Sequence, residues 1–172
     1  MAPRDARSRL PAGIIDYFVH RYYQGLDWHR NGKGVVEEGY ATTLLAREAE
    51  RVVREHDFAA KPLFLFFSPT APHAPMQVPT AYEEPDAEIA DPIRRTYAGM
   101  TAALDEAVGG LIDALAARGV RDRTLVLFLS DNGGSPSVGG RIDPMRGEKR
   151  ELLEGGVRVP AIASWPGLLP AG

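Results

Sequence analysis

The sequence places one histidine in a loop whose prolines restrict the backbone on both sides of it. His73 lies within Ser68-Pro-Thr-Ala-Pro-His-Ala-Pro-Met-Gln-Val-Pro79, directly after an apolar run. An imidazole held in place can donate a hydrogen bond to an anionic oxygen or protonate a leaving group. A solvated loop histidine without a role is the alternative, and for His73 taken alone that alternative is better supported. The other histidines share no spacing and are expected in surface or packing roles: His20, His29 and His56.

A carboxylate and an amide stand side by side in Ser130-Asp-Asn-Gly-Gly134. Asp131 and Asn132 offer the oxygen ligands that Ca²⁺ and Mg²⁺ prefer. The same residue types form ordinary turns, which is the simpler interpretation without further context. Residues 131–156, however, make a long loop without regular periodicity, and such loops in compact domains are usually functional or disordered. Disorder fits poorly between two buried strands, so the position favours a binding role.

The same long loop also carries positive charge. Arg146-Gly-Glu-Lys149 puts two cations on a backbone that contains glycine, and this arrangement suits an oxyanion ligand. Cations in loops are more often only solvated. Lys149 is therefore a candidate anion-binding residue because of the loop in which it lies.

Two apolar runs are expected to form the strands that carry these loops. Residues 62–67 and 124–130 are short and continuously apolar, a pattern typical of strands buried on both faces. Residues 157–164 predict a third, weaker strand. Each of the first two strands leads directly into one of the candidate loops.

Helical spacing appears before the first strand and between the first two. Residues 38–56 carry apolar side chains at that spacing, with Thr42 or Thr43 as the expected N-cap. Later in the chain, Asp91 can cap a helix whose first position is Pro92. The order strand, helix, strand predicts a right-handed crossover between two parallel strands.

The predicted fold class is therefore α/β, with a mostly parallel central sheet and helices on both faces. In open sheets of this kind, ligands bind beyond the carboxyl ends of the strands. Segments that leave this edge carry four candidate residues: His73, Asp131, Asn132 and Lys149. One pocket is expected to hold all four.

Composition restricts the choice of partners. The 172 residues are enough for a single domain with one core. Basic and acidic residues are interspersed and the formal charge is −3, which argues against nucleic acid as a partner. Cysteine is absent, so this sequence supplies no disulfide, thiolate metal ligand or cysteine nucleophile. Residues 1–10 contain arginines but no apolar run, so neither a signal peptide nor a membrane span is expected there.

Seven segments resemble the arylsulfatase family, within the alkaline-phosphatase-like superfamily, in their order and spacing. They are Asp27-Trp-His-Arg-Asn-Gly32, Glu38-Gly-Tyr40, Ala71-Pro-His-Ala-Pro-Met-Gln-Val-Pro79, residues 97–115, Leu129-Ser-Asp-Asn-Gly-Gly134, Arg146-Gly-Glu-Lys149 and Glu154-Gly-Gly-Val-Arg-Val-Pro160. The resemblance begins at about residue 14. Residues 14–172 are therefore expected to be one partial sulfatase domain, and residues 1–13 an unrelated or disordered start.

The resemblance implies a sulfuric ester hydrolase whose substrate is a sulfated glycan or another small sulfate ester. It carries the family's metal-binding role onto Asp131 and Asn132, with calcium or another divalent cation as the cofactor. It also implies that His73 and Lys149 are the catalytic and substrate-binding residues, which contact the sulfate and stabilise charge on the leaving oxygen. Arg146 is given a structural role. Hydrolysis of a phosphoric or phosphonic monoester is the sister interpretation.

The sequence departs from the family at the nucleophile, which in sulfatases is a formylglycine made from a Cys/Ser-x-Pro-Ser-Arg motif. That motif does not occur here, and neither does the family's upstream strand with its other metal-binding aspartates. The interpretations are a truncated gene or fragment, which is favoured, a split protein completed by another chain, or a degenerate homologue. The isolated chain is expected to be inactive. A non-catalytic metal-binding or anion-binding module is the alternative from a different functional class.

Overall fold

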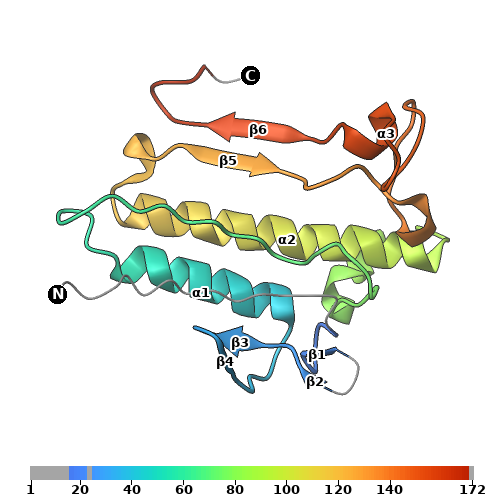
Figure 1. Cartoon of the computed structure of the whole chain (residues 1–172), viewed down its shortest axis with the longest axis horizontal. Helices are drawn as coiled ribbons and strands as arrows, with labels where there is room; N and C mark the ends of the chain where they lie inside the picture. The colour runs from blue at the N-terminus through green and yellow to red at the C-terminus, as the bar shows by residue number, and fades with distance from the viewer. Residues whose placement is uncertain (1–15, 23–24, 171–172) are drawn as a thin grey trace.

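The computed structural model describes residues 16–22 and 25–170, so the expected boundary near residue 14 lies outside the described part. The helices are α1 (Ala41–Glu55), α2 (Pro92–Ala117) and the short α3 (Glu154–Val157). The strands are β1 (Arg21–Tyr22), β2 (Gly25–Leu26), β3 (His29–Arg30), β4 (Lys33–Gly34), β5 (Val126–Leu129) and β6 (Ala161–Ser164). Single 3₁₀ turns are η1 (Thr80–Tyr82), η2 (Glu84–Asp86), η3 (Arg121–Arg123) and η4 (Pro136–Val138). Figure 1 shows α1 and α2 side by side, with β5 and β6 beyond α2.

Helix α2 begins where the sequence predicts. Asp91 has extended backbone angles, and its side chain accepts hydrogen bonds from the amides of Ile93 and Arg94. These bonds satisfy amide groups that a helix start leaves without partners, and Pro92 has no amide hydrogen to satisfy. The expected cap and the expected first residue are both confirmed. Within the described residues, no helix is long and apolar enough to cross a membrane.

Helix α1 is confirmed, but its expected N-cap is wrong. Tyr40 precedes the helix, and no side chain caps it. The amide of Ala41 instead donates to the carbonyl of Tyr17 at 2.8 Å. A backbone carbonyl from a distant segment therefore does what a threonine hydroxyl was expected to do, and Thr42 lies buried inside the first turn.

The two long helices pack closely along most of α1. Two hydrophobic clusters contain buried side chains from both helices: Leu45 and Met100 in one, and Val53 and Leu115 in the other. A Cβ atom at Gly110 of α2 would lie 2.5 Å from Oε1 of Glu50. The helix therefore carries a glycine at a point of close approach, despite the cost of glycine in a helix.

The expected parallel sheet is not seen in the described part of the chain. Residues 62–67 are extended, but they form no backbone hydrogen bonds with described residues. Strand β5 pairs only with β6, and that pairing is antiparallel, with Leu127 opposite Ala163. Figure 1 shows residues 62–67 running in the same direction as β5. The predicted parallel orientation is therefore present between these segments without the predicted ladder, and the third strand runs the opposite way.

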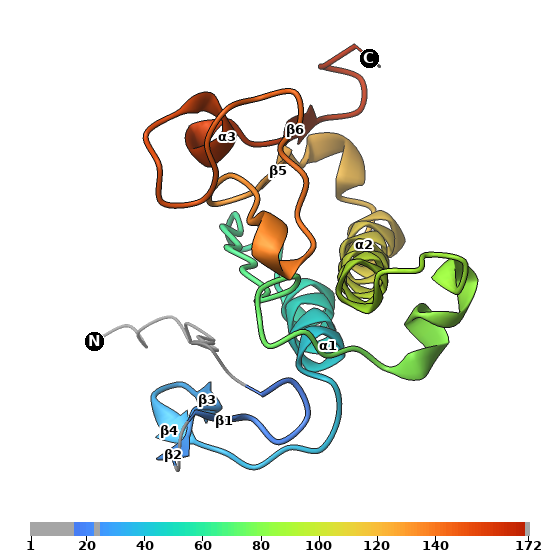
Figure 2. The same cartoon turned by 90° about the vertical axis from the view of Figure 1, so that its right-hand side faces the viewer.

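The apolar strands are covered on one face only, so the prediction that both faces are buried is wrong. Along residues 62–67 the side chains alternate, with Leu63 and Leu65 packed against the helical core. Phe64 and Phe66 are 90% and 79% exposed. Figure 2 shows α1 and α2 on the same side of β5 and of residues 62–67. Among the described residues, no long helix covers the other face.

This arrangement predicts opposite outcomes for two neighbouring truncations. Leu65→Ala is expected to lower the free energy of unfolding by about 2 kcal/mol, because Leu65 packs between the helices and β5. Phe66→Ala is expected to change it by less than about 0.5 kcal/mol, because that ring lies in solvent. Urea denaturation of both variants measures the difference. A larger loss for Phe66→Ala would show that the outer face is covered in the folded chain.

Candidate functional site

Both candidate loops leave the same end of the molecule, the end at which α2 begins (Figure 1). Residues 68–79 follow the extended segment 62–67, and residues 130–156 connect β5 to β6. Helix α2 touches both loops. A Cβ atom at Gly99 would lie 3.2 Å from Val78, and one at Gly139 would lie 2.8 Å from Tyr97. The N-terminal half of α2 is thus the common support that brings the two loops to one end.

His73 is exposed, and its ring is oriented by the backbone of its own loop. Its Nδ1 atom lies 2.7 Å from the carbonyl oxygen of Ala74. A carbonyl can only accept a hydrogen bond, so Nδ1 carries the proton and Nε2 is the free nitrogen of the neutral ring. Cis peptide bonds join Ala71 to Pro72 and Ala74 to Pro75 on either side of the histidine. Nε2 has no hydrogen-bond partner within the described part of the chain.

Asp131 and Asn132 leave their oxygens free. The Asn132 amide nitrogen donates to the carbonyl of Gly133 at 3.2 Å, so its Oδ1 atom remains available. Ser130 Oγ donates to the carbonyl of Asn132 at 3.1 Å and fixes the bend. The exposed carboxylate of Asp131 has no hydrogen bond or ion pair with any described residue. The bend fits the ordinary-turn interpretation, and the three free side-chain oxygens fit the cation-ligand interpretation.

Backbone contacts join the Asp131 loop to the segment that carries Lys149. The amide of Lys149 donates to the carbonyl of Gly134 at 2.9 Å, and the amide of Gly133 donates to the carbonyl of Gly156 at 2.9 Å. A Cβ atom at Gly133 would lie 1.8 Å from the carbonyl oxygen of Gly155. Only glycine permits this approach. Sequence reasoning assigned no role to these glycines, although the sequence itself shows two Gly-Gly pairs, at 133–134 and 155–156.

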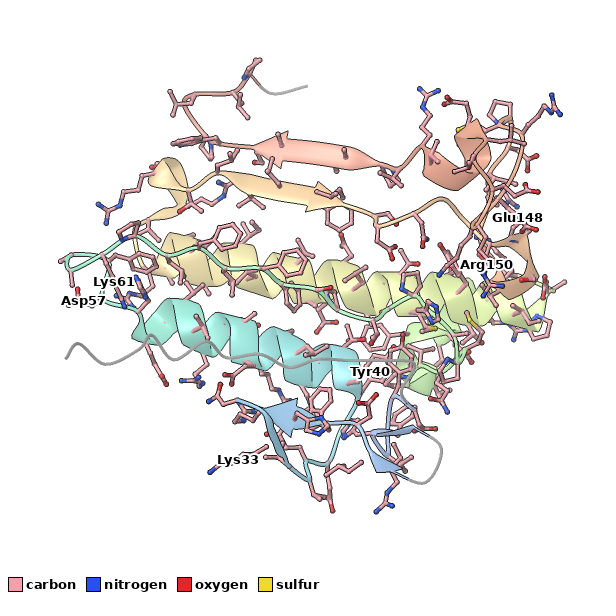
Figure 3. All side chains as sticks on the ribbon, viewed as in Figure 1. Lys33, Tyr40, Asp57, Lys61, Glu148 and Arg150 are labelled. Carbon is pink, nitrogen blue, oxygen red and sulfur yellow. The ribbon has the colours of Figure 1, made fainter. Side chains whose placement is uncertain are left out.

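Lys149 lies between two exposed charged residues, Glu148 and Arg150, at the same end of the molecule (Figure 3). Its side chain is half-buried, and its ammonium group has no partner in the described part of the chain. The structure therefore places Lys149 beside the Asp131 loop. It places His73 at the same end, but among the described residues no hydrogen bond or ion pair joins the His73 loop to Asp131, Asn132 or Lys149.

A surface hollow lined by residues next to Lys149 in the sequence does not suit an anion. Its lining contains the carboxylates Glu148 and Glu151, and it contains none of the four predicted site residues. Among residues 16–22 and 25–170, no group of three or more His, Cys, Asp or Glu side chains could hold a metal ion. Asp131 and Asn132 fit a hard cation by the chemistry of their oxygens, but they provide only part of the six to eight ligands that calcium takes.

The comparisons with known proteins agree on one family. The family model described as Sulfatase matches residues 9–171. Mouse arylsulfatase J is 36% identical over 162 residues, which are 90% of this chain and 27% of that protein. Dog N-acetylgalactosamine-6-sulfatase is 31% identical over 171 residues, which are 97% of this chain and 31% of that protein. The chain thus spans about three-tenths of the length of these relatives.

Solved structures agree with this result. The crystal structure of Ps i-CgsB in complex with k-i-k-neocarrahexaose is similar with a TM-score of 0.86 at 34% identity. The match covers 95% of this chain and 40% of that one. The putative sulfatase yidJ from Bacteroides fragilis has a TM-score of 0.67 at 21% identity, which shows a shared fold.

Proposed function

This chain belongs to the sulfatase family, and we propose that it is the part of a sulfuric ester hydrolase that binds the sulfate group. The observation that carries the proposal is the bond from the Lys149 amide to the Gly134 carbonyl. This bond joins the segment that carries the cationic Lys149 to the loop that carries the free oxygens of Asp131 and Asn132. A lysine and two metal ligands held in the same loop suit the binding of an anionic ester.

Asp131 and Asn132 would hold a divalent cation, which we propose is calcium, through Oδ atoms that no described residue occupies. When bound, such an ion supplies electrostatic stabilisation to oxygens of the sulfate group. The remaining ligands would come from residues outside the described part of the chain.

His73 and Lys149 would act on the anion directly. The bond from Nδ1 to the Ala74 carbonyl leaves Nε2 of His73 free, and protonated Nε2 can donate to a sulfate oxygen or to the leaving oxygen. The Lys149 ammonium group would stabilise negative charge that develops in the transition state. Both groups lack partners among the described residues, so neither would have to break a protein contact in order to bind.

The sequence contains no Cys/Ser-x-Pro-Ser-Arg motif and no cysteine. We therefore propose that the nucleophile is supplied from outside this sequence, and that the isolated chain does not hydrolyse a sulfate ester. The exposed apolar face supports the same view. Residues 62–67 have no backbone partners in the described part, and Phe64 and Phe66 lie in solvent. Further strands and helices would complete the parallel sheet and cover this face.

The substrate class we propose is a sulfate ester of a carbohydrate or an aryl group. The names of the relatives support this range, because one refers to arylsulfates and the other to N-acetylgalactosamine 6-sulfate. We propose residues 14–172 as one partial domain that contributes to this activity.

Calorimetric titration of the chain with sodium sulfate in the presence of Ca²⁺ tests the proposal. His73→Ala and Lys149→Ala are each expected to weaken sulfate binding by about tenfold or more, because each removes a hydrogen-bond donor to an anion. Lys33→Ala is the control, since Lys33 is an exposed cation on a distant hairpin (Figure 3). Sulfate binding that all three variants retain would contradict the proposed roles.

A further inference from the structure

Two stacked tyrosines support the His73 loop. The rings of Tyr17 and Tyr40 lie with centroids 5.4 Å apart at an interplanar angle of 23°. Their side chains are buried, with 1% and 6% exposure. Tyr17 Oη donates to the carbonyl of His73 at 2.8 Å, and Tyr40 Oη donates to the carbonyl of Gln77 at 3.1 Å. The loop backbone is therefore held at two points, and one of them is His73 itself.

The segment that carries Tyr17 is itself tied to the same loop. Gln77 Oε1 accepts from the Tyr17 amide at 2.9 Å, and Gln77 Nε2 donates to Asp16 Oδ2 at 2.7 Å. Desolvation raises the pKa of Asp16, but hydrogen bonds from Gln77 and from the amides of Val19 and Phe18 outweigh it, and the pKa lies below its usual value. Asp16 is thus an ionised acceptor that holds Gln77 and the turn after it in place.

Tyr17 is well suited to act as a fixed donor. Its carbonyl accepts from the amide of Ala41, the first residue of α1, so both its backbone and its ring are anchored. Burial raises the pKa of the Tyr17 phenol above its usual value. The hydroxyl therefore stays protonated and can donate throughout the neutral range.

The bond from Tyr17 acts on the peptide group that determines how the His73 ring is held. The carbonyl of His73 belongs to the peptide unit that joins it to Ala74. The carbonyl of Ala74 is the group that accepts from Nδ1 of His73 at 2.7 Å. A rotation of the first peptide unit would move the second carbonyl away from the ring, because the two groups are adjacent in the backbone.

We propose that Tyr17 is a positioning residue for His73: its hydroxyl fixes the His73 carbonyl, which keeps Nδ1 protonated and bonded to the Ala74 carbonyl. Nε2 is then free to take up a proton and to donate a hydrogen bond to an oxyanion. This inference rests on the proposed sulfate-binding role of His73. Tyr17 touches neither sulfate nor metal, and it lies far from His73 in the sequence. Neither a motif nor the family resemblance assigned it a role.

Tyr17→Phe in the full chain tests the inference, because it removes one oxygen atom and keeps the ring. Nitrogen-15 NMR of the neutral imidazole reports which ring nitrogen carries the proton. The wild-type chain is expected to show the form protonated at Nδ1, and the variant a mixture of both forms. Sulfate binding in the presence of Ca²⁺ is expected to weaken by roughly tenfold in the variant, about the effect of one lost hydrogen bond to an ionised ligand.

Tyr40→Phe is the matched control, since it removes an equally buried hydroxyl that bonds the same loop at Gln77. It is expected to keep the wild-type proton position and sulfate binding. Gln77→Met removes both side-chain bonds to Tyr17 and Asp16, and it provides a second test if Tyr17→Phe does not fold. That variant is also expected to give a mixture of the two ring forms. Backbone amide spectra establish that each variant is folded.

The outcomes separate this inference from the proposed function. A Tyr17→Phe chain with the wild-type ring form overturns the positioning role, and so do equal changes in Tyr17→Phe and Tyr40→Phe, which would indicate general loop stability. Wild-type sulfate binding in His73→Ala would instead overturn the proposed role of His73, whatever the Tyr17 variant shows.

Discussion

Replacing Gly133 with alanine is expected to abolish calcium and sulfate binding and to lower the free energy of unfolding by about 3 kcal/mol. The added Cβ atom would lie 1.8 Å from the carbonyl oxygen of Gly155 and 2.8 Å from the Cα of Gly156. Both neighbours are backbone atoms, so no side chain can move aside. The two parts of the 130–156 loop would have to separate, which would break the bond between Gly133 and Gly156 and move Lys149 away from Asp131.

Gly109→Ala is the control for this prediction. Gly109 lies within α2, and a Cβ atom there would meet nothing within 4 Å. Alanine is favoured over glycine in a helix by about 1 kcal/mol, so this variant is expected to be slightly more stable and to bind both ions as before. For both variants, calorimetric titration measures the binding of calcium and sulfate, and urea denaturation measures the free energy of unfolding. Unchanged calcium binding in Gly133→Ala would show that the metal ligands do not depend on the contact between the two parts of the 130–156 loop.

Asp131→Ala is expected to weaken calcium binding by about 100-fold, because it removes the charged member of the proposed ligand pair. Asn132→Ala, which removes a neutral oxygen, is expected to weaken it by about tenfold. Neither change should affect folding, since neither side chain takes part in the core. Calorimetric titration with Ca²⁺ measures the calcium affinity of both variants.

Asp105→Ala provides the charge-matched control for the aspartate. Asp105 is an exposed residue of α2, and its loss changes the net charge by the same amount. If calcium affinity falls equally in Asp105→Ala and Asp131→Ala, then general electrostatic attraction explains the binding. The turn interpretation of Asp131 and Asn132 would then be the better one.

Local sequence signals predicted the helices and the positions of the loops. Asp91 followed by proline gave the start of α2, because capping depends on neighbouring residues only. The apolar runs gave the position of β5 and the extended form of residues 62–67. These runs could not show that one face is exposed, since an apolar residue in a sequence does not reveal whether a segment that would pack against it is present in the folded chain. Phe66 is the clearest example, predicted as buried and found 79% exposed.

The contacts that hold the candidate site could not be predicted in the same way. The bond from Tyr17 to the carbonyl of His73 joins residues 56 positions apart, and no periodicity reveals such a pair. The approach of Gly133 to Gly155 likewise depends on how two distant parts of one loop fold back. Sequence reasoning identified residues with suitable chemistry, and the structure adds the groups that orient them.

Paramagnetic relaxation by Mn²⁺, used in place of Ca²⁺, tests most directly whether the two loops form one site. This broadening falls steeply with distance from the ion, so it maps the surroundings of the bound metal. We expect small amounts of Mn²⁺ to broaden the NMR signals of Asn132, Gly133, Lys149 and the His73 ring, and to leave His56 at the far end of α1 unchanged. Broadening confined to Asn132 and Gly133 would contradict a site shared with His73, and broadening centred elsewhere would contradict the metal assignment.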